Sequence, residues 1–185
     1  MIKKGRLFVI SAPSGAGKGT VIERLMQIRP ELKLSVSATT RPPRKGEVHT
    51  VSYYFVSRES FQEMISKDEF LEYAEYVGEM YGSPKAPIYE HVSEGRNVLL
   101  EIEVQGAKQI KEKEPCAVSI IIIPPDMEEL ERRLRGRGTD SDEKIASRLA
   151  RARQELEYKD QYDYIVVNDE VSRAANEILS IIDRV

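Results

Sequence analysis

A glycine-rich stretch that ends in a lysine is the strongest chemical signal in the sequence. It runs from Ala12 to Thr20 and reads Ala-Pro-Ser-Gly-Ala-Gly-Lys-Gly-Thr, directly after a short apolar run. Glycines at 15 and 17 let the backbone turn its N–H groups inward around a phosphate, and the following helix adds its positive dipole end. Lys18 can then reach the β- and γ-phosphates of ATP. A glycine-rich turn without a ligand is the alternative, and the position of the lysine favours phosphate binding. We expect ATP contacts from Ser14, Gly15, Ala16, Gly17, Lys18, Gly19 and Thr20.

This loop departs from the common pattern Gly-x-x-x-x-Gly-Lys-(Ser/Thr) at two positions. Ala12 replaces the first glycine, and Gly19 stands where a serine or threonine would hold Mg²⁺. The nearest hydroxyl therefore belongs to Thr20. We expect Mg²⁺ as the cofactor, held near Thr20 largely through water. A phosphate loop alone is shared by many ATPases, GTPases and small-molecule kinases, and the absence of an Asn-Lys-x-Asp motif disfavours a GTPase.

Two arginines separated by two prolines form a second candidate site. The segment reads Arg41-Pro42-Pro43-Arg44. Because proline restricts the backbone, the two guanidinium groups are presented with little ordering cost. This arrangement suits an anion such as a substrate phosphate, with a solvated basic turn as the alternative.

Apolar patterning predicts the elements that must position these residues. Strands are expected at 7–10, 97–101, 118–123 and 164–167, and helices at 18–28, 104–113, 127–135, 144–158 and 174–182. Continuous apolar strands that alternate with helices predict an open, doubly wound parallel sheet covered on both faces. Between about 35 and 94 the pattern changes: 53–56 and 70–77 read as antiparallel strands flanking a helix at 59–67, which indicates an inserted subdomain. The polar stretch 135–143 reads as a mobile loop between two helices.

Composition fits one soluble globular domain. The chain has 185 residues, of which 41% are hydrophobic and 32% charged, with a formal net charge of -3. This near-balance argues against a general nucleic-acid binder. The single cysteine, Cys116, cannot form an internal disulfide, and its apolar neighbours predict a buried thiol. We see neither a signal peptide nor a membrane span, and we expect a cytoplasmic protein that is a monomer or a homodimer.

The sequence resembles the guanylate kinase family in motifs spread along nearly the whole chain. The segment from Ser37 to Glu47 matches the family pattern Ser-x-Thr-Thr-Arg-x-x-Arg-x-Gly-Glu. The other matching segments are Tyr53-Tyr54-Phe55, Glu69-Phe70-Leu71-Glu72, Tyr81-Gly82-Ser83, Glu101-Ile102-Glu103-Val104-Gln105-Gly106, Arg133 to Thr139 and Val166-Val167-Asn168-Asp169. The resemblance implies a P-loop nucleoside monophosphate kinase with an open parallel sheet. Its core would comprise residues 1–34 and 96–185, its mixed α+β GMP-binding insert residues 35–95, and its mobile lid residues 135–148.

The resemblance also implies a role for individual residues in transferring the γ-phosphate of ATP to GMP, and to dGMP. Arg41, Arg44, Tyr53 and Tyr81 would hold the GMP phosphate, while Ser37, Glu72 and Ser83 would read guanine. Glu72 would accept from the guanine N1–H and 2-amino groups, donors that adenine lacks. Gly82, Glu101 and Glu103 complete the expected GMP site, and Glu101, at the end of an apolar strand, would also hold the water shell of Mg²⁺.

On the donor side the resemblance implies a set of lid arginines. Arg133, Arg137 and Arg148 would close over the ATP phosphates, and Asn168 and Asp169 would lie beside adenine. The expected catalytic residues are Lys18, Arg41, Arg137 and Arg148. Other arginines nearby are expected on solvated helix faces: Arg132, Arg135, Arg151 and Arg153.

Two alternatives stay open at this stage. Another nucleoside monophosphate kinase, such as an adenylate kinase, can share the Gly-Lys-Gly-Thr loop, but the 37–47 segment and Glu72 disfavour it. Some guanylate kinase-like domains bind peptides instead of nucleotides. Those domains typically lack an intact phosphate loop, whereas Lys18, Arg41 and Arg137 are all present here.

Overall fold

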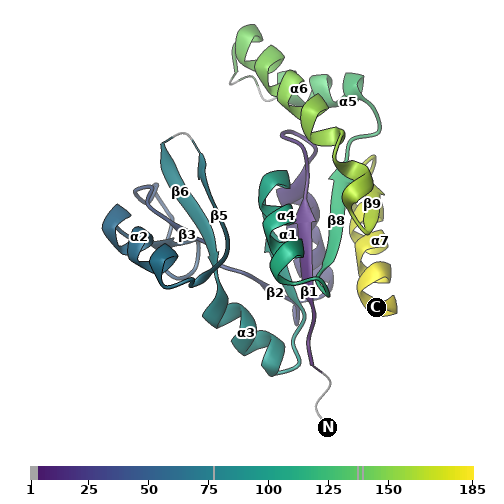
Figure 1. Ribbon diagram of the computed structural model, residues 1–185. Helices are drawn as coiled ribbons and strands as arrows, with labels where there is room; N and C mark the ends of the chain where they lie inside the picture. The colour runs from purple at the N-terminus through teal and green to yellow at the C-terminus, as the bar shows by residue number, and fades with distance from the viewer. Residues whose placement is uncertain (1–3, 77, 137, 139) are drawn as a thin grey trace.

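The computed structural model describes residues 4–76, 78–136, 138 and 140–185. Its main sheet has five strands in the order β2-β7-β1-β8-β9, and every neighbouring pair is parallel (Figure 1). The strands are β1 (Leu7–Ser11), β2 (Lys33–Leu34), β7 (Val98–Glu101), β8 (Val118–Ile123) and β9 (Tyr164–Val167). The expected parallel α/β sheet is therefore confirmed. Because all five strands run the same way, their carboxyl ends lie along one edge, where open sheets of this kind bind ligands.

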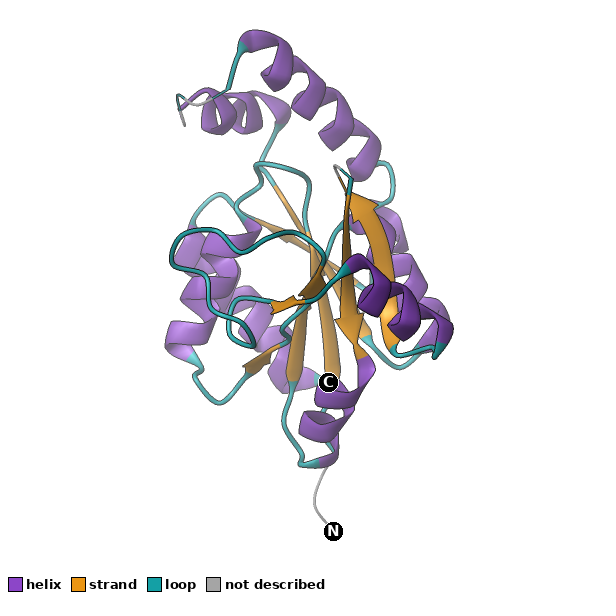
Figure 2. Cartoon of the chain, turned by 90° about the vertical axis from the view of Figure 1, so that its left-hand side faces the viewer, coloured by secondary structure: helices purple, strands orange, loops and turns teal. Residues whose placement is uncertain are grey.

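Helices cover both faces of this sheet (Figure 2). Along β1, Phe8 and Ile10 point into one apolar cluster, while Leu7 and Val9 point into another, as the two-residue period of a strand requires. The first cluster is closed by α1 (Lys18–Ile28) and α7 (Val171–Arg184), and the second by α3 (Lys85–Ser93) and α4 (Val104–Lys113). Among the described residues, no helix is long and apolar enough to cross a membrane.

A second, smaller sheet lies beside the first (Figure 1). Its strands are β3 (Ala38–Thr39), β4 (Tyr54–Phe55), β5 (Phe70–Tyr76) and β6 (Glu79–Pro84), in the order β4-β3-β6-β5, and α2 (Arg58–Ser66) packs against it. The prediction of antiparallel strands at 53–56 and 70–77 holds for the second strand, because β5 pairs antiparallel with β6 at one edge. It is wrong for the first, because β4 pairs in parallel with β3 at the other edge. Strand β6 was not predicted from the sequence, because it contains Gly82 and Pro84, which have low strand propensity.

The division into core and insert is less sharp than a boundary at 95 suggests. Although α3 follows the second sheet in the chain, its Ile88 is buried in an apolar cluster of the main sheet. The Gly5 N–H also donates to the Val92 carbonyl of this helix. The division into residues 1–34, 35–95 and 96–185 stays a proposal.

Two helices form an arm above the carboxyl edge of the main sheet (Figure 1). They are α5 (Met127–Gly136) and α6 (Asp142–Leu156), and a short 3₁₀ turn at Lys159–Gln161 follows them. They bury a small apolar cluster of their own, made of Leu130, Leu134, Ile145, Leu149 and Ala152. The loop expected at 135–143 is shorter than predicted, because α5 continues to Gly136 and Ser141 caps α6 by accepting a hydrogen bond from the Lys144 N–H.

The single cysteine corrects another expectation. Cys116 is exposed, although its apolar neighbours predicted a buried thiol. It lies in the turn between α4 and β8, and burial begins one residue later, at Ala117. A pattern of apolar neighbours does not resolve which residue of a turn faces solvent.

Candidate active site

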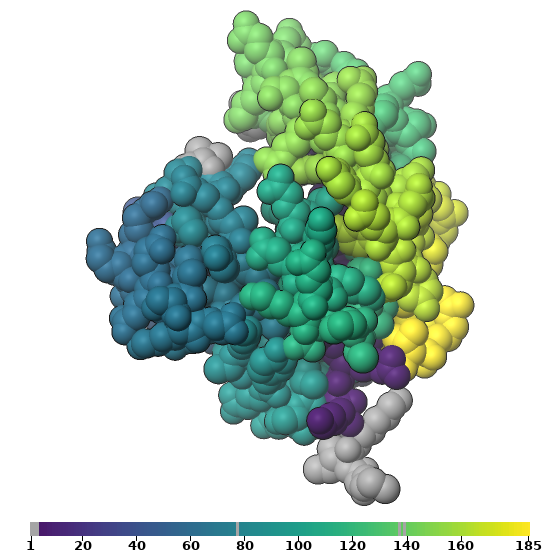
Figure 3. Space-filling model, in the orientation of Figure 1, coloured from purple at the N-terminus to yellow at the C-terminus, as the bar shows by residue number. Residues whose placement is uncertain are grey.

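A cavity of about 520 Å³ lies between the carboxyl edge of the main sheet and the second sheet. In the space-filling view, the hollow separates the second sheet from the core and the arm (Figure 3). Many residues singled out from the sequence line it: Ser14, Lys18, Ser37, Tyr53, Glu72, Tyr81, Gly82, Glu101 and Glu103. Together with Arg151, the structure gathers residues that are up to 137 positions apart in the chain, from Ser14 to Arg151 (151 − 14), around one space.

The phosphate loop has the conformation that its glycines permit. Gly15 and Gly17 have φ angles of 92° and 89°, in the left-handed region that favours glycine. A Cβ on Gly15 would meet the Leu134 side chain at 2.7 Å, and one on Gly17 would meet the Asn168 amide nitrogen at 2.5 Å. The loop is therefore packed from behind by α5 and by the end of β9, which fixes its shape.

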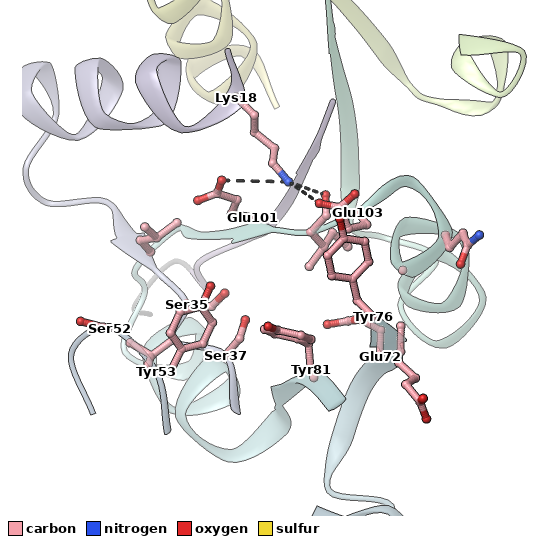
Figure 4. Close-up of a pocket in the computed structure, with 18 of the residues that line it drawn as sticks. Lys18, Ser35, Ser37, Ser52, Tyr53, Glu72, Tyr76, Tyr81, Glu101 and Glu103 are labelled. Carbon is pink, nitrogen blue, oxygen red and sulfur yellow. Dashed lines mark hydrogen bonds and ion pairs between the residues drawn. The ribbon is translucent and has the colours of Figure 1, made fainter. Parts of the chain in front are cut away.

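Lys18 reaches from this loop into the cavity. Its ammonium donates to the Ile102 carbonyl at 3.0 Å and lies 3.7 Å from a Glu103 oxygen and 4.0 Å from a Glu101 oxygen. Only 15% of its side chain is exposed. In the close-up view Lys18 enters from one side, while Ser37, Tyr53 and Tyr81 lie on the opposite side (Figure 4). This places the Lys18 ammonium between the loop and the second sheet.

The arm touches the phosphate loop through Ser14. Arg148 of α6 donates twice to the Ser14 hydroxyl, at 3.1 and 2.9 Å, and it donates once to Asp140 at 2.5 Å. Hydrogen bonds from Lys144 and then Arg148 hold the pKa of Asp140 below its ordinary value. The Ser14 N–H is 3.3 Å from a carboxylate oxygen of Glu155, which is also on α6. Of the lid arginines, Arg148 therefore already contacts the loop, whereas Arg137 lies outside the described residues.

Arg133 and Asn168 brace the back of the loop. Arg133 donates to the Asn168 carbonyl at 2.8 Å and to the Ala16 carbonyl at 3.4 Å. The buried Asn168 amide donates to the same Ala16 carbonyl at 2.7 Å. Asp169 is exposed and pairs with Arg173. The expected contacts of Arg133, Asn168 and Asp169 with ATP stay predictions.

On the acceptor side, the Glu47 carboxylate accepts hydrogen bonds from both arginines of the Arg-Pro-Pro-Arg segment. Glu47 accepts from the Arg41 guanidinium at 2.8 Å and from the Arg44 backbone N–H at 2.7 Å. The Arg41 hydrogen bond is the main reason that the pKa of Glu47 is lowered. Arg41 also lies over the Tyr53 ring, 5.5 Å from its centroid. Neither arginine lines the cavity, although Tyr53 and Tyr81 do, and the expected contacts of Arg41 and Arg44 with the GMP phosphate stay predictions.

Replacing Arg41 by alanine should raise the KM for GMP roughly 10- to 100-fold and leave the KM for ATP within about twofold. A charge-assisted bond to a phosphate contributes about 1.5–3 kcal/mol, and only the acceptor would lose it. Steady-state kinetics with each nucleotide varied in turn would measure both constants. Arg58→Ala is the matched control, because Arg58 is an exposed arginine on α2 of the same subdomain. Equal changes in both KM values would assign Arg41 to the donor or to the fold.

Glu72 is a buried carboxylate at the wall of the cavity. Glu72 is only 6% exposed. Burial is the main reason that the pKa of its carboxyl is raised, although the hydrogen bond from Ser83 opposes the shift. The Ser83 hydroxyl donates to Glu72 Oε1 at 2.6 Å. Ser83 is itself buried and does not line the cavity, so in this structure it orients Glu72. Its direct contact with guanine stays a prediction.

One arginine lies elsewhere than expected. Arg151 was predicted on a solvated helix face, but it lines the cavity and lies 3.3 Å from Glu103 and 2.8 Å from Glu155. Its guanidinium also covers the Tyr76 ring at the end of β5, 5.2 Å from the centroid. The position of Arg151 could have been predicted from its spacing, because it follows Arg148 by three residues and both side chains therefore lie on one face of α6.

The carboxyl end of β7 fits a magnesium site. Glu101 Oε1 lies 3.9 Å from where a Cβ on Gly19 would stand, so the missing side chain leaves room beside this carboxylate. The described residues contain no group of three histidine, cysteine or acidic side chains that could hold a metal. Mg²⁺ commonly keeps several waters and uses only one or two carboxylates together with substrate phosphates, so the chemistry fits. Thr20 is exposed and does not line the cavity.

These features define a class of protein: a P-loop α/β protein whose phosphate loop borders a cavity of about 520 Å³ that a second, smaller sheet also lines. The sequence profile described as Guanylate kinase matches residues 4–185, and the chain belongs to the guanylate kinase family. It is 52% identical to the guanylate kinase of Clostridioides difficile (strain 630), covering 98% of this chain and 88% of that protein. It is 51% identical to the guanylate kinase of Synechocystis sp., and the match covers 97% of this chain and 94% of that protein. The crystal structure of guanylate kinase from Anaplasma phagocytophilum superposes with a TM-score of 0.79 at 36% identity. The superposition covers 98% of this chain and 86% of that protein.

Proposed function

We propose that this protein transfers the γ-phosphate of ATP to GMP, giving ADP and GDP, and that it also accepts dGMP. The observation that carries the proposal is a buried carboxylate, Glu72, held by Ser83 across the cavity from the phosphate loop and Lys18. A buried acceptor of this kind selects a base with paired N–H donors, because the wrong base would leave it unpaired. Membership of the guanylate kinase family supports the same assignment.

The donor side would be formed by the phosphate loop and the arm. Backbone N–H groups of the loop and Lys18 would hold the ATP phosphates, while Arg148, Arg133 and Arg137 would neutralise their charge. The Glu101 carboxylate would hold Mg²⁺ through water, with Thr20 as the other candidate. When bound, Mg²⁺ would offset charge shared by the β- and γ-phosphates.

The acceptor side would be formed by the second sheet and the chain around it. Arg41, Arg44, Tyr53 and Tyr81 would hold the GMP phosphate, and Glu72 with Ser37 would read the base. Glu103, which lies 3.7 Å from Lys18, and Gly82 would complete the wall. Because the GMP phosphate is already ionised, it can attack directly, and no side chain has to act as a strong base. These residues would contribute mainly by positioning and charge neutralisation.

A coupled assay of ADP formation with GMP, AMP, UMP and CMP as acceptors tests this function. We expect kcat/KM for GMP to exceed that for the other acceptors by about 100-fold or more, because the site is built to accept guanine donors. A preference for AMP would identify an adenylate kinase instead. ADP formation with none of the four would identify a binding module.

We further propose that the protein acts on free nucleotides in the cytoplasm, in purine nucleotide metabolism and GMP recycling, as a monomer or a homodimer. The formal net charge of -3 favours small-molecule partners over nucleic acid. An exposed, single cysteine is compatible with a reducing compartment.

A further inference from the structure

Helix α4 of the core lies along the free edge of β5, the strand that carries Glu72. Gln109 exchanges two hydrogen bonds with the Tyr73 backbone, donating to its carbonyl at 3.1 Å and accepting from its N–H at 3.3 Å. One turn further along the helix, Lys113 donates to the Phe70 carbonyl at 3.0 Å. Because β5 is the outermost strand of its sheet, these backbone groups have no strand partner on that side. One face of α4 thus fixes the position of β5.

Gly106 lies on the same face of α4, three residues before Gln109, and it faces the Glu72 carboxylate. A Cβ on Gly106 would be 2.9 Å from Glu72 Oε2, 3.3 Å from Cδ and 3.5 Å from Cγ. Gly106 lies inside α4 and has no positive φ, so its backbone conformation does not require glycine. Alanine is the more favourable residue inside a helix. The space at this position is needed by Glu72.

We propose that Gly106 is a specificity-determining positioning residue for the acceptor base. Its missing side chain lets the Glu72 carboxylate rest against the first turn of α4, where Ser83 holds the other carboxylate oxygen at 2.6 Å. The proposal rests on the proposed role of Glu72 in reading guanine. A methyl group at position 106 would push the end of a flexible side chain, which disturbs the fold little but moves the atoms that face the base.

The test is Gly106→Ala. We expect kcat/KM for GMP to fall about 10- to 100-fold, mostly through a higher KM, because a shift of about 1 Å in a recognition group has effects of this size. The KM for ATP should stay within about twofold, and the thermal midpoint should not fall, because alanine favours the helix. Glu112→Ala is the matched control, since Glu112 is exposed on the same helix, and it should leave GMP kinetics unchanged.

A second measurement separates action through Glu72 from a general effect. In a Glu72→Ala background, adding Gly106→Ala should change kcat/KM for GMP by less than about twofold, because the group it displaces is gone. A loss of GMP and ATP affinity together with a lower thermal midpoint would overturn the inference, as Gly106 would then support the fold. If Gly106→Ala keeps the wild-type KM for GMP while Glu72→Gln raises it, only the Gly106 inference fails. If neither variant changes GMP kinetics, the role of Glu72 fails with it.

Discussion

Replacing Lys18 by alanine should lower the rate of phosphoryl transfer by roughly 100- to 1,000-fold, the usual effect of removing one preorganised charge at the reacting phosphate. The Lys18 ammonium lies 4.0 Å or less from the Ile102 carbonyl, Glu103 and Glu101, all at the end of β7. It therefore stands between the phosphate loop and the acceptor side. No neighbouring cation in the loop could replace it, because the other loop residues are uncharged.

The fold should survive this substitution. Lys18 is the first residue of α1, and alanine is a better helix former at that place. Thermal unfolding and single-turnover kinetics with GMP would report fold and chemistry separately. Lys67→Ala serves as the control, because Lys67 is an exposed lysine whose ammonium pairs with Glu63. A Lys18→Ala enzyme with near-normal turnover would show that the loop does not hold the transferred phosphate.

The second large effect concerns base choice. Glu72→Gln keeps the size of the side chain but turns one acceptor into a donor, which would face the guanine N–H groups. We expect kcat/KM for GMP to fall about 10- to 100-fold, which corresponds to losing roughly 1.5–3 kcal/mol of charge-assisted bonding. AMP should change little, because it cannot use the carboxylate. Steady-state kinetics with both acceptors at saturating ATP decide the matter, and a parallel fall would make Glu72 structural.

The same variant has a stability readout with a defined sign. Burial raises the pKa of Glu72 above its ordinary value of 4.5, so the folded protein holds this proton more tightly than the unfolded chain does. The stabilisation from that proton is present below pH 4.5 and is lost as the pH rises through the folded pKa. The glutamine side chain of the Glu72→Gln variant does not titrate, so the thermal midpoint of this variant, relative to wild type, should rise from about pH 4 to about pH 7. A difference that stays constant over this range would mean that the carboxylate is solvated.

Much of the core could be predicted from sequence, because its signals are local. An apolar strand, a glycine loop, a lysine and a helix follow one another between 7 and 28, and their order alone places the loop at the carboxyl end of a strand. The four long core strands and their parallel arrangement follow from continuous apolar runs separated by helices, which need cover on both faces. Glu72 could be identified only through the resemblance, since a lone glutamate on a strand is ordinarily solvated.

Only the tertiary structure decided which side chains contact one another. The Ser83 hydroxyl donates to Glu72 from a buried position, because β5 and β6 pair with a shift in register that sequence does not reveal. Arg151 was expected in solvent, yet it reaches Glu103 and Tyr76 across the cavity. Gly106 lies inside a helix, where glycine is locally unfavourable, and the side chain that needs the space lies 34 residues away at Glu72 (106 − 72). Such contacts join segments distant in the chain, so they depend on packing between subdomains and not on propensity or period.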